Sequence, residues 1–369
     1  MRIFPLSRAW LSAFLCNFVI GARAGIDLRY FCFMNAFGIP HHQIERYSNS
    51  LRSVPSGIPQ VKRCNYRVVH GKTVMGDAPK ALVRIFSYSK DNHFRKVNAK
   101  RWPLYIAKTG HKWYPIESIT ERLLCRLGEV FGLRMAESGL AVIGGQVRFL
   151  SKYFLNGEDQ ELVHGAEIFA GYIGDEEFVA QIEEQQLSRD MFTLQFVDKA
   201  IEYQFSFCRD EIMQEFVKML LFDTLVGNND RHFYNWGVVR SITQSFQPYY
   251  APVYDTARGL FWNDTDEKLE NRYKNHSASY LKKYCEGSRP KIGWEGEKNI
   301  NHFGLVEKIY ANEFFLCKNE IKALFLQSNP KKMFEVIDSE FSSLMSEARI
   351  KMIKLCLEYR YNTIVELLK

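Results

Sequence analysis

The stretch Leu221–Arg240 reads LFDTLVGNNDRHFYNWGVVR, and the stretch Ala251–Trp262 reads APVYDTARGLFW. The first places Asp230 and Asn235 five positions apart, in a loop between an apolar helix and a predicted strand. A carboxylate in such a loop can orient or accept the proton of an attacking hydroxyl, and an amide oxygen suits Mg²⁺, which prefers oxygen ligands. Asp255 is expected to end the next strand, where a hairpin would bring its carboxylate back beside Asn235. The pattern therefore predicts a metal-assisted site for phosphoryl transfer.

The alternative interpretation of these residues is an ordinary polar turn, because Asn, Asp and Gly are favoured in turns. A single residue of this kind would carry little weight, whereas the ordered set favours a functional site. His232 follows Asp230 by two positions. We expect His232 to brace the loop by hydrogen bonding rather than to act as a base.

The order D-R-H-x-x-N followed by a strand-borne Asp resembles the catalytic core of the HipA-like serine/threonine kinases. The wider pattern, G-N-x-D-R-H-x-x-N-W-G with A-P-x-x-D, is closest to a stand-alone subgroup of these bacterial kinases. The resemblance covers roughly residues 81–369, with sharp motifs only in 221–262. Phosphatidylinositol kinases share D-R-H-x-x-N, so the motif alone does not determine the substrate.

The resemblance implies a role for each residue of the loop. Asp230 would be the catalytic base with His232 bracing it, and Asn235 and Asp255 would be ligands of Mg²⁺. The implied cofactors are ATP and Mg²⁺, and the implied acceptor is a Ser or Thr hydroxyl of a protein, including the chain itself. An antitoxin-like or regulatory partner is a further implication.

The same comparison assigns nucleotide contacts in the first half of the chain. Lys108 ends the predicted strand PLYIAK, where such kinases place the lysine that contacts the α- and β-phosphates. Glu121 lies thirteen residues further on and would anchor Lys108 as an ion pair, with Glu117 as a rival one helical turn earlier. The segment Arg148–Leu155 would form the hinge between lobes, and Phe154 within it is assigned to the adenine site.

One segment departs from the family pattern. These kinases usually cover the phosphates with a loop rich in Gly or Ser, and the span assigned to that loop, residues 87–96, contains no glycine. Without glycine, close approach of backbone N–H groups to phosphate is harder. Lys90, Arg95 and Lys96 are expected to substitute through their side chains. The alternative is a poor catalyst or a nucleotide-binding pseudokinase that acts as an interaction module.

The hydrophobic pattern predicts an α+β protein with a two-lobed, protein-kinase-like fold. The expected units are an N-terminal extension (1–75), a small β-rich lobe (76–155) and a larger helical lobe (156–369). The predicted elements are strands at 81–88 and 104–108, a helix from Glu117 to Gly132, a hairpin over 141–154, a helix ending near Gly227, a second hairpin (237–240 with 249–254), and one helix carrying Ile337, Phe341, Leu344 and Ala348.

The amino-acid composition excludes some classes of protein and disfavours others. At 46% hydrophobic and 14% aromatic residues, the 369-residue chain can build a core, which excludes a disordered or fibrous protein. Residues 60–112 contain 13 Lys or Arg against two acidic residues, which suits a bound polyanion or a solvated surface. No recognisable nucleic-acid module accompanies this charge, so direct nucleic-acid binding is disfavoured.

Cysteine usage and the N-terminus bear on location. The eight cysteines are scattered without a C-x-x-C pair, which disfavours a zinc site and suits a reducing, cytoplasmic compartment. No run of eighteen apolar residues indicates an integral membrane segment. Residues 1–24 have the outline of a signal peptide, interrupted by Asn17, and secretion or delivery out of the cell is therefore the alternative.

Overall fold

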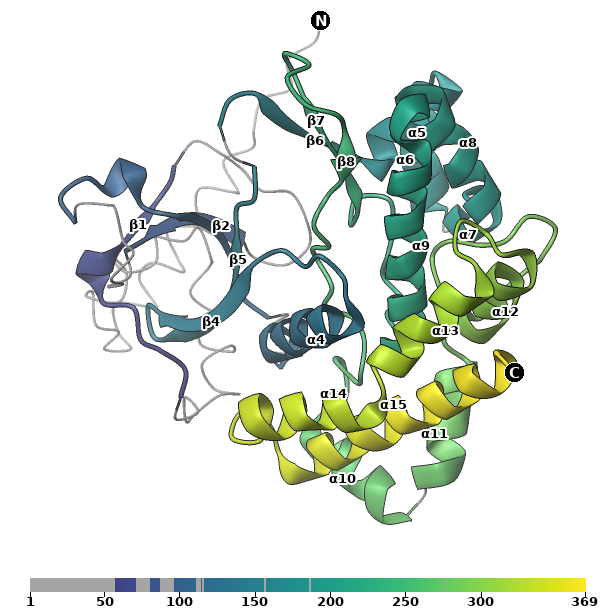
Figure 1. Cartoon of the computed structure of the whole chain (residues 1–369). Coiled ribbons are helices and arrows are strands. Elements are labelled where there is room, and N and C mark those ends of the chain that lie inside the picture. The colour runs from purple at the N-terminus through teal and green to yellow at the C-terminus, as the bar shows by residue number, and fades with distance from the viewer. Residues whose placement is uncertain are drawn as a thin grey trace, which may run out of the picture.

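The computed structural model describes residues 57–70, 80–86, 96–110, 114, 116–155, 157–185, 187–275 and 277–369. These residues form a β-rich lobe and a larger, mainly helical lobe (Figure 1). The predicted two-lobed α+β fold is confirmed. The signal-like segment 1–24 lies outside the described residues.

The β-rich lobe is a five-stranded antiparallel sheet with the order β1–β2–β3–β5–β4. Alternation explains β2, because Val83 and Ile85 are buried whereas Arg84 points the other way and donates to the Trp102 carbonyl at 2.7 Å. The predicted strand at 104–108 and the predicted glycine-turn hairpin are confirmed. The strands are β1 (Tyr66–Val68), β2 (Lys80–Ile85), β3 (Leu104–Lys108), β4 (Ser138–Ile143) and β5 (Gln146–Lys152).

The sheet also uses residues that precede position 76, where the small lobe was expected to start. Tyr66 of β1 is buried and pairs with Ile85 at one edge of the sheet. At the opposite edge, the Val61 amide donates to the Val142 carbonyl at 2.9 Å, and the Val142 amide donates to the Pro59 carbonyl at 2.9 Å. The short segment 59–68 therefore contacts both edges, and a 3₁₀ turn (Arg63–Asn65) joins its two parts.

Helix α4 (Glu117–Phe131) connects the two lobes. It ends where predicted, at Gly132, whose φ of 91° is accessible to glycine without strain. Its buried face, including Leu124 and Leu127, belongs to the main hydrophobic core of the helical lobe. The same helix packs on β4 and β5, so that it holds the sheet against the helices.

The helical lobe contains a small antiparallel sheet with the order β6–β7–β8. Its strands are β6 (Gln160–His164), β7 (Gly237–Ser241) and β8 (Tyr249–Tyr250). The helices are α5 (Gly165–Ile173), α6 (Glu176–Glu184), α7 (Ser188–Met191), α8 (Leu194–Phe205), α9 (Arg209–Val226), α10 (Asp266–Asn275), α11 (Ser277–Glu286), α12 (His302–Asn312), α13 (Lys318–Gln327), α14 (Pro330–Val336) and α15 (Glu347–Leu367). Short 3₁₀ turns span Ala99–Arg101 and Ser206–Cys208.

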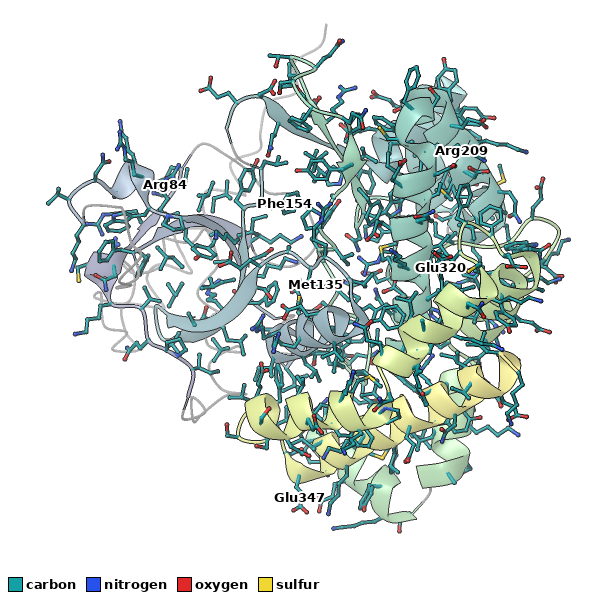
Figure 2. All side chains as sticks on the ribbon, viewed as in Figure 1. Arg84, Met135, Phe154, Arg209, Glu320 and Glu347 are labelled. Atoms are coloured by element: carbon teal, nitrogen blue, oxygen red, sulfur yellow. The ribbon has the colours of Figure 1, made fainter. Side chains whose placement is uncertain are left out.

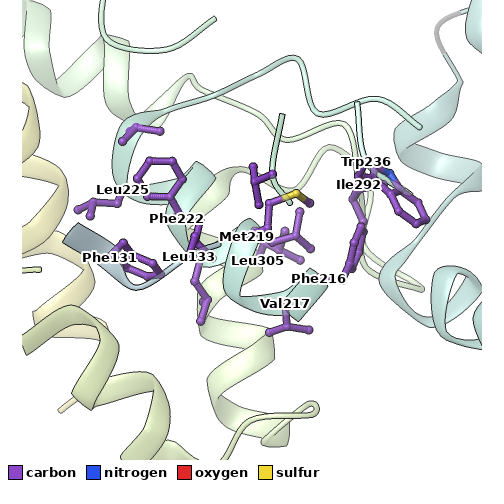
Figure 3. Packing of buried hydrophobic residues seen from close by; sticks show 14 of the residues in the cluster. Phe131, Leu133, Phe216, Val217, Met219, Phe222, Leu225, Trp236, Ile292 and Leu305 are labelled. Carbon is purple, nitrogen blue, oxygen red and sulfur yellow. The ribbon is translucent and has the colours of Figure 1, made fainter. Parts of the chain in front are cut away.

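Helix α9 is the centre of this lobe. Every residue of the helix from Met219 to Val226 is buried, Asp223 and Thr224 included, as expected of a helix surrounded by protein. Phe216, Met219 and Phe222 pack against residues from other elements, among them Trp236 and Leu305 (Figure 3). The helix ends where predicted, at Gly227, and the loop with the D-R-H-x-x-N motif follows at once. A rigid core helix thus sets the starting point of the candidate site.

Two element predictions were wrong. Strand β8 ends at Tyr250, so Asp255 lies in an irregular segment rather than at the end of a strand. The last predicted helix is broken: Ile337–Phe341 is a π-helical turn, the chain then turns, and α15 starts after Ser346. The Ser346 hydroxyl accepts a hydrogen bond from the Arg349 amide, so a local cap competes with continuation of the apolar pattern.

Among the described helices, none combines the length and apolar composition needed to cross a lipid bilayer.

Candidate active site

Charged side chains from both lobes meet where the sheet faces the helical lobe. They come from the start of β2, the end of β3, helix α4, the loop 227–236 and the segment 254–258. Two chains of ion pairs result. One runs from Lys80 through Asp255 and Lys108 to Glu121.

Lys108 makes the contacts that the sequence assigned to it, and one more. Its Nζ lies 2.6 Å from Glu121 Oε1 and 2.8 Å from Asp255 Oδ1. Glu117 lies elsewhere, 3.9 Å from Arg258, so Glu121 is the partner. Burial disfavours the ammonium, yet Asp255 and Glu121 hold the pKa of Lys108 above its ordinary value. Burial raises the pKa of Glu121 to about 7, although the charge of Lys108 acts in the opposite direction.

Asp255 lies between two ammonium groups. Besides Lys108, its carboxylate accepts from Lys80 Nζ at 3.3 Å. Burial alone would raise the pKa of Asp255, but the two lysines outweigh it and hold the pKa below the ordinary value, so the group is ionised at neutral pH. An ionised carboxylate that attracts two cationic groups has the chemistry of a Mg²⁺ ligand.

The backbone at Asp255 is unusual. Its φ of 53° lies in the left-handed region, which a residue with a side chain occupies only where its surroundings hold it. Arg231 provides this hold from the neighbouring loop. Its guanidinium donates to the Tyr254 carbonyl at 2.8 Å and to the Thr256 hydroxyl at 2.7 Å, on either side of Asp255.

Arg231 is buried and uses its remaining donors on two other elements. It forms an ion pair with Asp223 of α9, with bonds of 2.9 and 3.1 Å, and donates to the Asn235 carbonyl at 2.9 Å. One side chain thus joins helix α9, the loop 227–236 and the segment around Asp255. The sequence reasoning missed Arg231, although its position inside the motif was a signal, since arginine has five donors in a fixed geometry.

The loop residues of the motif bond mainly to their own backbone. The Asn235 side-chain amide donates to the Asp230 carbonyl at 2.8 Å, which uses its nitrogen, whereas a cation would bind its oxygen. The His232 amide also donates to the Asp230 carbonyl at 2.8 Å, and His232 Nδ1 accepts from the Tyr234 amide at 3.3 Å. This geometry suits the bracing role expected of His232.

The Asp230 carboxylate lies at the end of the second chain of ion pairs. Its Oδ2 is 3.2 Å from Arg258 Nη1, and Arg258 also approaches Glu117. Burial raises the pKa of Asp230, and the charges of Arg258 and His232 oppose the rise. Arg258 is a second residue that the sequence reasoning missed.

The hinge is shorter than expected. Arg148 lies within β5, buried in the sheet, and donates to the Gln146 side chain at 2.8 Å and to the Thr109 hydroxyl. The connection from β5 to β6 starts only after Lys152. Phe154, labelled in Figure 2, lies in this connection, with its ring 5.9 Å from that of Tyr254, next to Asp255.

The sequence assigned the phosphates to the loop 87–96, which follows β2. The residue of β2 that contacts Asp255 is Lys80, at the start of the strand. Lys90 and Arg95 lie outside the described residues, but Lys96 contacts Cys64 Sγ at 3.9 Å and the Phe86 ring, beyond the Ile85 end of β2. A six-residue strand spans about 17 Å, and Lys80 is at its other end.

Lys80 follows directly on the connection between β1 and β2. The sequence of that connection contains Gly71 and Gly76, and residues 71–79 lie outside the described residues. Lys80 faces Lys108 directly in the sheet register. Lys80 was not predicted as a site residue, because the phosphate loop was assigned to residues 87–96 after β2 and not to the connection before it.

Residues 73–299 match the family model of the HipA-like C-terminal domain. The chain belongs to this family. Among curated proteins, this HipA-like chain is 25% identical over 200 residues to a Haemophilus influenzae protein described as a kinase, across 50% of the chain and 52% of that protein. It is 24% identical over 161 residues to the serine/threonine-protein kinase CtkA of Helicobacter pylori, across 41% and 44%. The chain spans about half the length of these curated relatives.

Two solved structures resemble the chain, and the first of them shows its fold. The crystal structure of the Helicobacter pylori proinflammatory kinase CtkA has a TM-score of 0.64 at 19% identity, covering 84% of this chain and 97% of that one. HipA of a Shewanella oneidensis toxin–antitoxin system, solved with HipB and operator DNA, has a TM-score of 0.49 at 12% identity, over 91% and 85%. The HipA-like chain thus has the two-lobed fold of CtkA.

Proposed function

We propose that this HipA-like chain is an ATP- and Mg²⁺-dependent kinase that transfers the γ-phosphoryl group to a Ser or Thr hydroxyl of a protein. The observation that carries the proposal is the ion-paired set Lys108–Glu121–Asp255, formed across the two lobes next to the Asp230 loop. A buried lysine held by one carboxylate and shared with a second is able to exchange that second partner for phosphate oxygens.

Each residue has a distinct task in this proposal. Lys108 and Lys80 bind phosphate oxygens, and Glu121 keeps Lys108 in place when its bond to Asp255 is released. Asp255 and Asn235 would hold Mg²⁺, which neutralises charge on the phosphates when bound. Asp230 orients the acceptor hydroxyl and receives its proton. Phe154 and the adjoining backbone would contact the adenine.

Two alternatives compete with this proposal. A phosphoinositide kinase is expected to have a membrane-facing basic or apolar loop after Asp255. That segment is basic but not apolar, and three of its basic residues form ion pairs: Lys268 and Arg272 with Asp264, and Lys274 with Glu270. The pseudokinase hypothesis rested on a loop without glycine. Lys80, which contacts Asp255, instead follows the connection between β1 and β2, whose sequence contains Gly71 and Gly76. The missing glycines in 87–96 therefore no longer favour a pseudokinase.

The test is phosphoryl transfer by the full chain, compared with Asp255→Asn. This change keeps the shape of the side chain but removes its charge, so we expect ATP binding in Mg²⁺ to weaken and transfer to fall at least about 10²-fold. Transfer is measured with labelled ATP on the chain itself and on a generic Ser/Thr protein, and binding by calorimetry. Asp338→Asn, which removes an exposed partner of Lys354, is the matched control.

Three outcomes would contradict the proposal in different ways. Unchanged ATP·Mg²⁺ affinity in Asp255→Asn would remove Asp255 from the metal site. ATP binding without transfer to any protein would support a pseudokinase. Transfer to phosphatidylinositol vesicles but not to protein would identify a lipid kinase.

A further inference from the structure

Two buried cysteines lie side by side behind the candidate site. Cys285 of α11 and Cys356 of α15 are fully buried, and their sulfur atoms are 3.7 Å apart. A disulfide requires about 2.05 Å between sulfurs, so a shift of under 2 Å would join them. The other buried cysteines of the described chain, Cys125 and Cys208, form no such pair.

A buried arginine lies one helical turn beyond Cys356. Arg360 is fully buried, and its Nη1 donates to the Thr224 carbonyl at 2.9 Å. Its Nε and Nη2 have no hydrogen-bond partner, and no carboxylate pairs with it among the described residues. A buried cation without a counter-charge is costly.

The cysteine pair can supply the missing negative charge. The charge of Arg360 acts on Cys356, Cys285 and Tyr284. A hydrogen bond from Cys285, together with the charge of Arg360, lowers the pKa of Cys356 even though burial opposes ionisation. The same hydrogen bond and burial raise the pKa of Cys285, which keeps its proton. Of the two sulfur atoms, 3.7 Å apart, that of Cys356 is therefore the one whose ionisation the surroundings favour.

We propose that Cys356 and Cys285 are a redox pair that a hydroperoxide oxidises to a disulfide. The Cys356 sulfur, as its thiolate after loss of its proton to solvent, attacks the peroxide oxygen and the O–O bond breaks. Sulfenic acid forms at Cys356, and the departing alkoxide takes a proton from solvent and leaves as the alcohol, or as water where the peroxide is hydrogen peroxide. The Cys285 sulfur then attacks the Cys356 sulfur, and the hydroxyl leaves as water with the Cys285 proton. Two thiols lose two electrons, and one hydroperoxide is reduced to an alcohol and water.

Oxidation of the cysteine pair would change the stability of the loop that carries Asp230, and Arg360 would transmit this effect. Its guanidinium packs against Gly227, where a Cβ atom would lie 2.5 Å from Nη2, and Gly227 directly precedes the loop that carries Asp230. A disulfide has no charge, so oxidation deprives Arg360 of its counter-ion. We expect the last turn of α9 and the first residues of the loop to open more often.

The test uses the reduced full chain, treated with hydrogen peroxide, denatured, alkylated and digested for mass spectrometry. We expect a linked Cys285–Cys356 peptide, while Cys125 and Cys208 remain alkylated thiols. Arg360→Gln should slow formation of the linked peptide at least tenfold. In Cys285→Ser, dimedone should trap a sulfenic acid at Cys356.

The unmodified protein keeps the proposal falsifiable even where a variant fails to fold. If Cys285 and Cys356 both remain alkylated thiols after a treatment that oxidises exposed Cys64 and Cys317, the proposal is wrong. Hydrogen exchange over 224–231 should rise on oxidation, reverse with dithiothreitol and show no response to peroxide in Cys356→Ser. Unchanged exchange in the disulfide form would overturn the link to the loop. Neither measurement depends on kinase activity, so failure here is distinct from failure of the proposed function.

Discussion

Asp255 is held by two regions of different chemistry. On its side chain, the ammonium groups of Lys108 and Lys80 make single contacts of 2.8 and 3.3 Å. On its backbone, the guanidinium of Arg231 bonds both neighbouring residues and is itself paired with Asp223 inside the core. An ammonium is a point charge that can change partners, whereas a guanidinium with fixed donors holds a geometry. The comparison indicates one region that a ligand rearranges and one that stays in place.

We expect the largest effect, a loss of stability, from a substitution that removes Arg231 from the fixed region. Arg231→Met leaves the buried Asp223 carboxylate without a counter-charge among the described residues, with only the Asn228 side-chain amide still donating to it, so we expect the free energy of unfolding to fall by about 3–5 kcal/mol. Lys108→Met should cost less, because Glu121, whose pKa is about 7, can take up a proton when its partner is removed. Urea unfolding of both variants measures the difference. Equal losses would contradict the division into a fixed and an exchangeable region.

The second effect concerns the loop that the fixed region holds. Asp230→Ala removes the group that we propose orients the acceptor hydroxyl, so transfer should fall about 10²–10⁴-fold while ATP affinity stays the same. Single-turnover transfer and calorimetry are the measurements, with Asp338→Ala as an exposed control. Transfer within twofold of the unmodified chain would show that another residue positions the hydroxyl.

A smaller effect tests the exchangeable region. Lys80→Gln removes one of the charged contacts to phosphate that we propose, and the dissociation constant for ATP should rise about tenfold. The same change at Lys96, beyond the other end of β2, is the matched control and should have little effect. Adenosine has no phosphates, so its affinity should be unchanged in both variants. If Lys96→Gln is the variant that weakens ATP, the loop after β2 binds the phosphates after all.

The smallest effect is a shift of pH dependence. Burial raises the pKa of Asp230, and transfer needs its ionised form, so activity should be lost on the acid side at a higher pH than for an exposed carboxylate. Arg258 favours ionisation of Asp230, so Arg258→Gln should raise this pKa further and move the acid limb to higher pH. The pH profile of kcat/KM measures the shift. An unmoved limb, as expected for the exposed control Arg240→Gln, would show that Asp230 does not set it.

The sequence was sufficient wherever the signal is local. The helix before the motif, its end at Gly227, the strand that ends at Lys108 and the helix that carries Glu121 all follow from hydrophobic periodicity and capping residues within a few turns. The contact between Lys108 and Glu121, which the structure contains, was implied by the resemblance to HipA-like kinases rather than by these patterns. Local caps also explain the failure near Ser346, where a serine outweighed a continuing apolar pattern.

The contacts of Asp255 were beyond such reasoning because they join distant parts of the chain. Lys80 and Asp255 are separated by 175 positions, and no periodicity links a residue at the start of a strand to an irregular segment of another lobe. The left-handed backbone at Asp255 likewise depends on hydrogen bonds from Arg231. The charge of Arg231 can be buried because Asp223 of helix α9 forms an ion pair with it. Local patterns thus specify which helices and strands form and which residues have side chains suited to binding or catalysis. Packing of the two lobes decides which charges meet, because Coulombic and hydrogen-bond energies depend on distances that exist only in the folded chain.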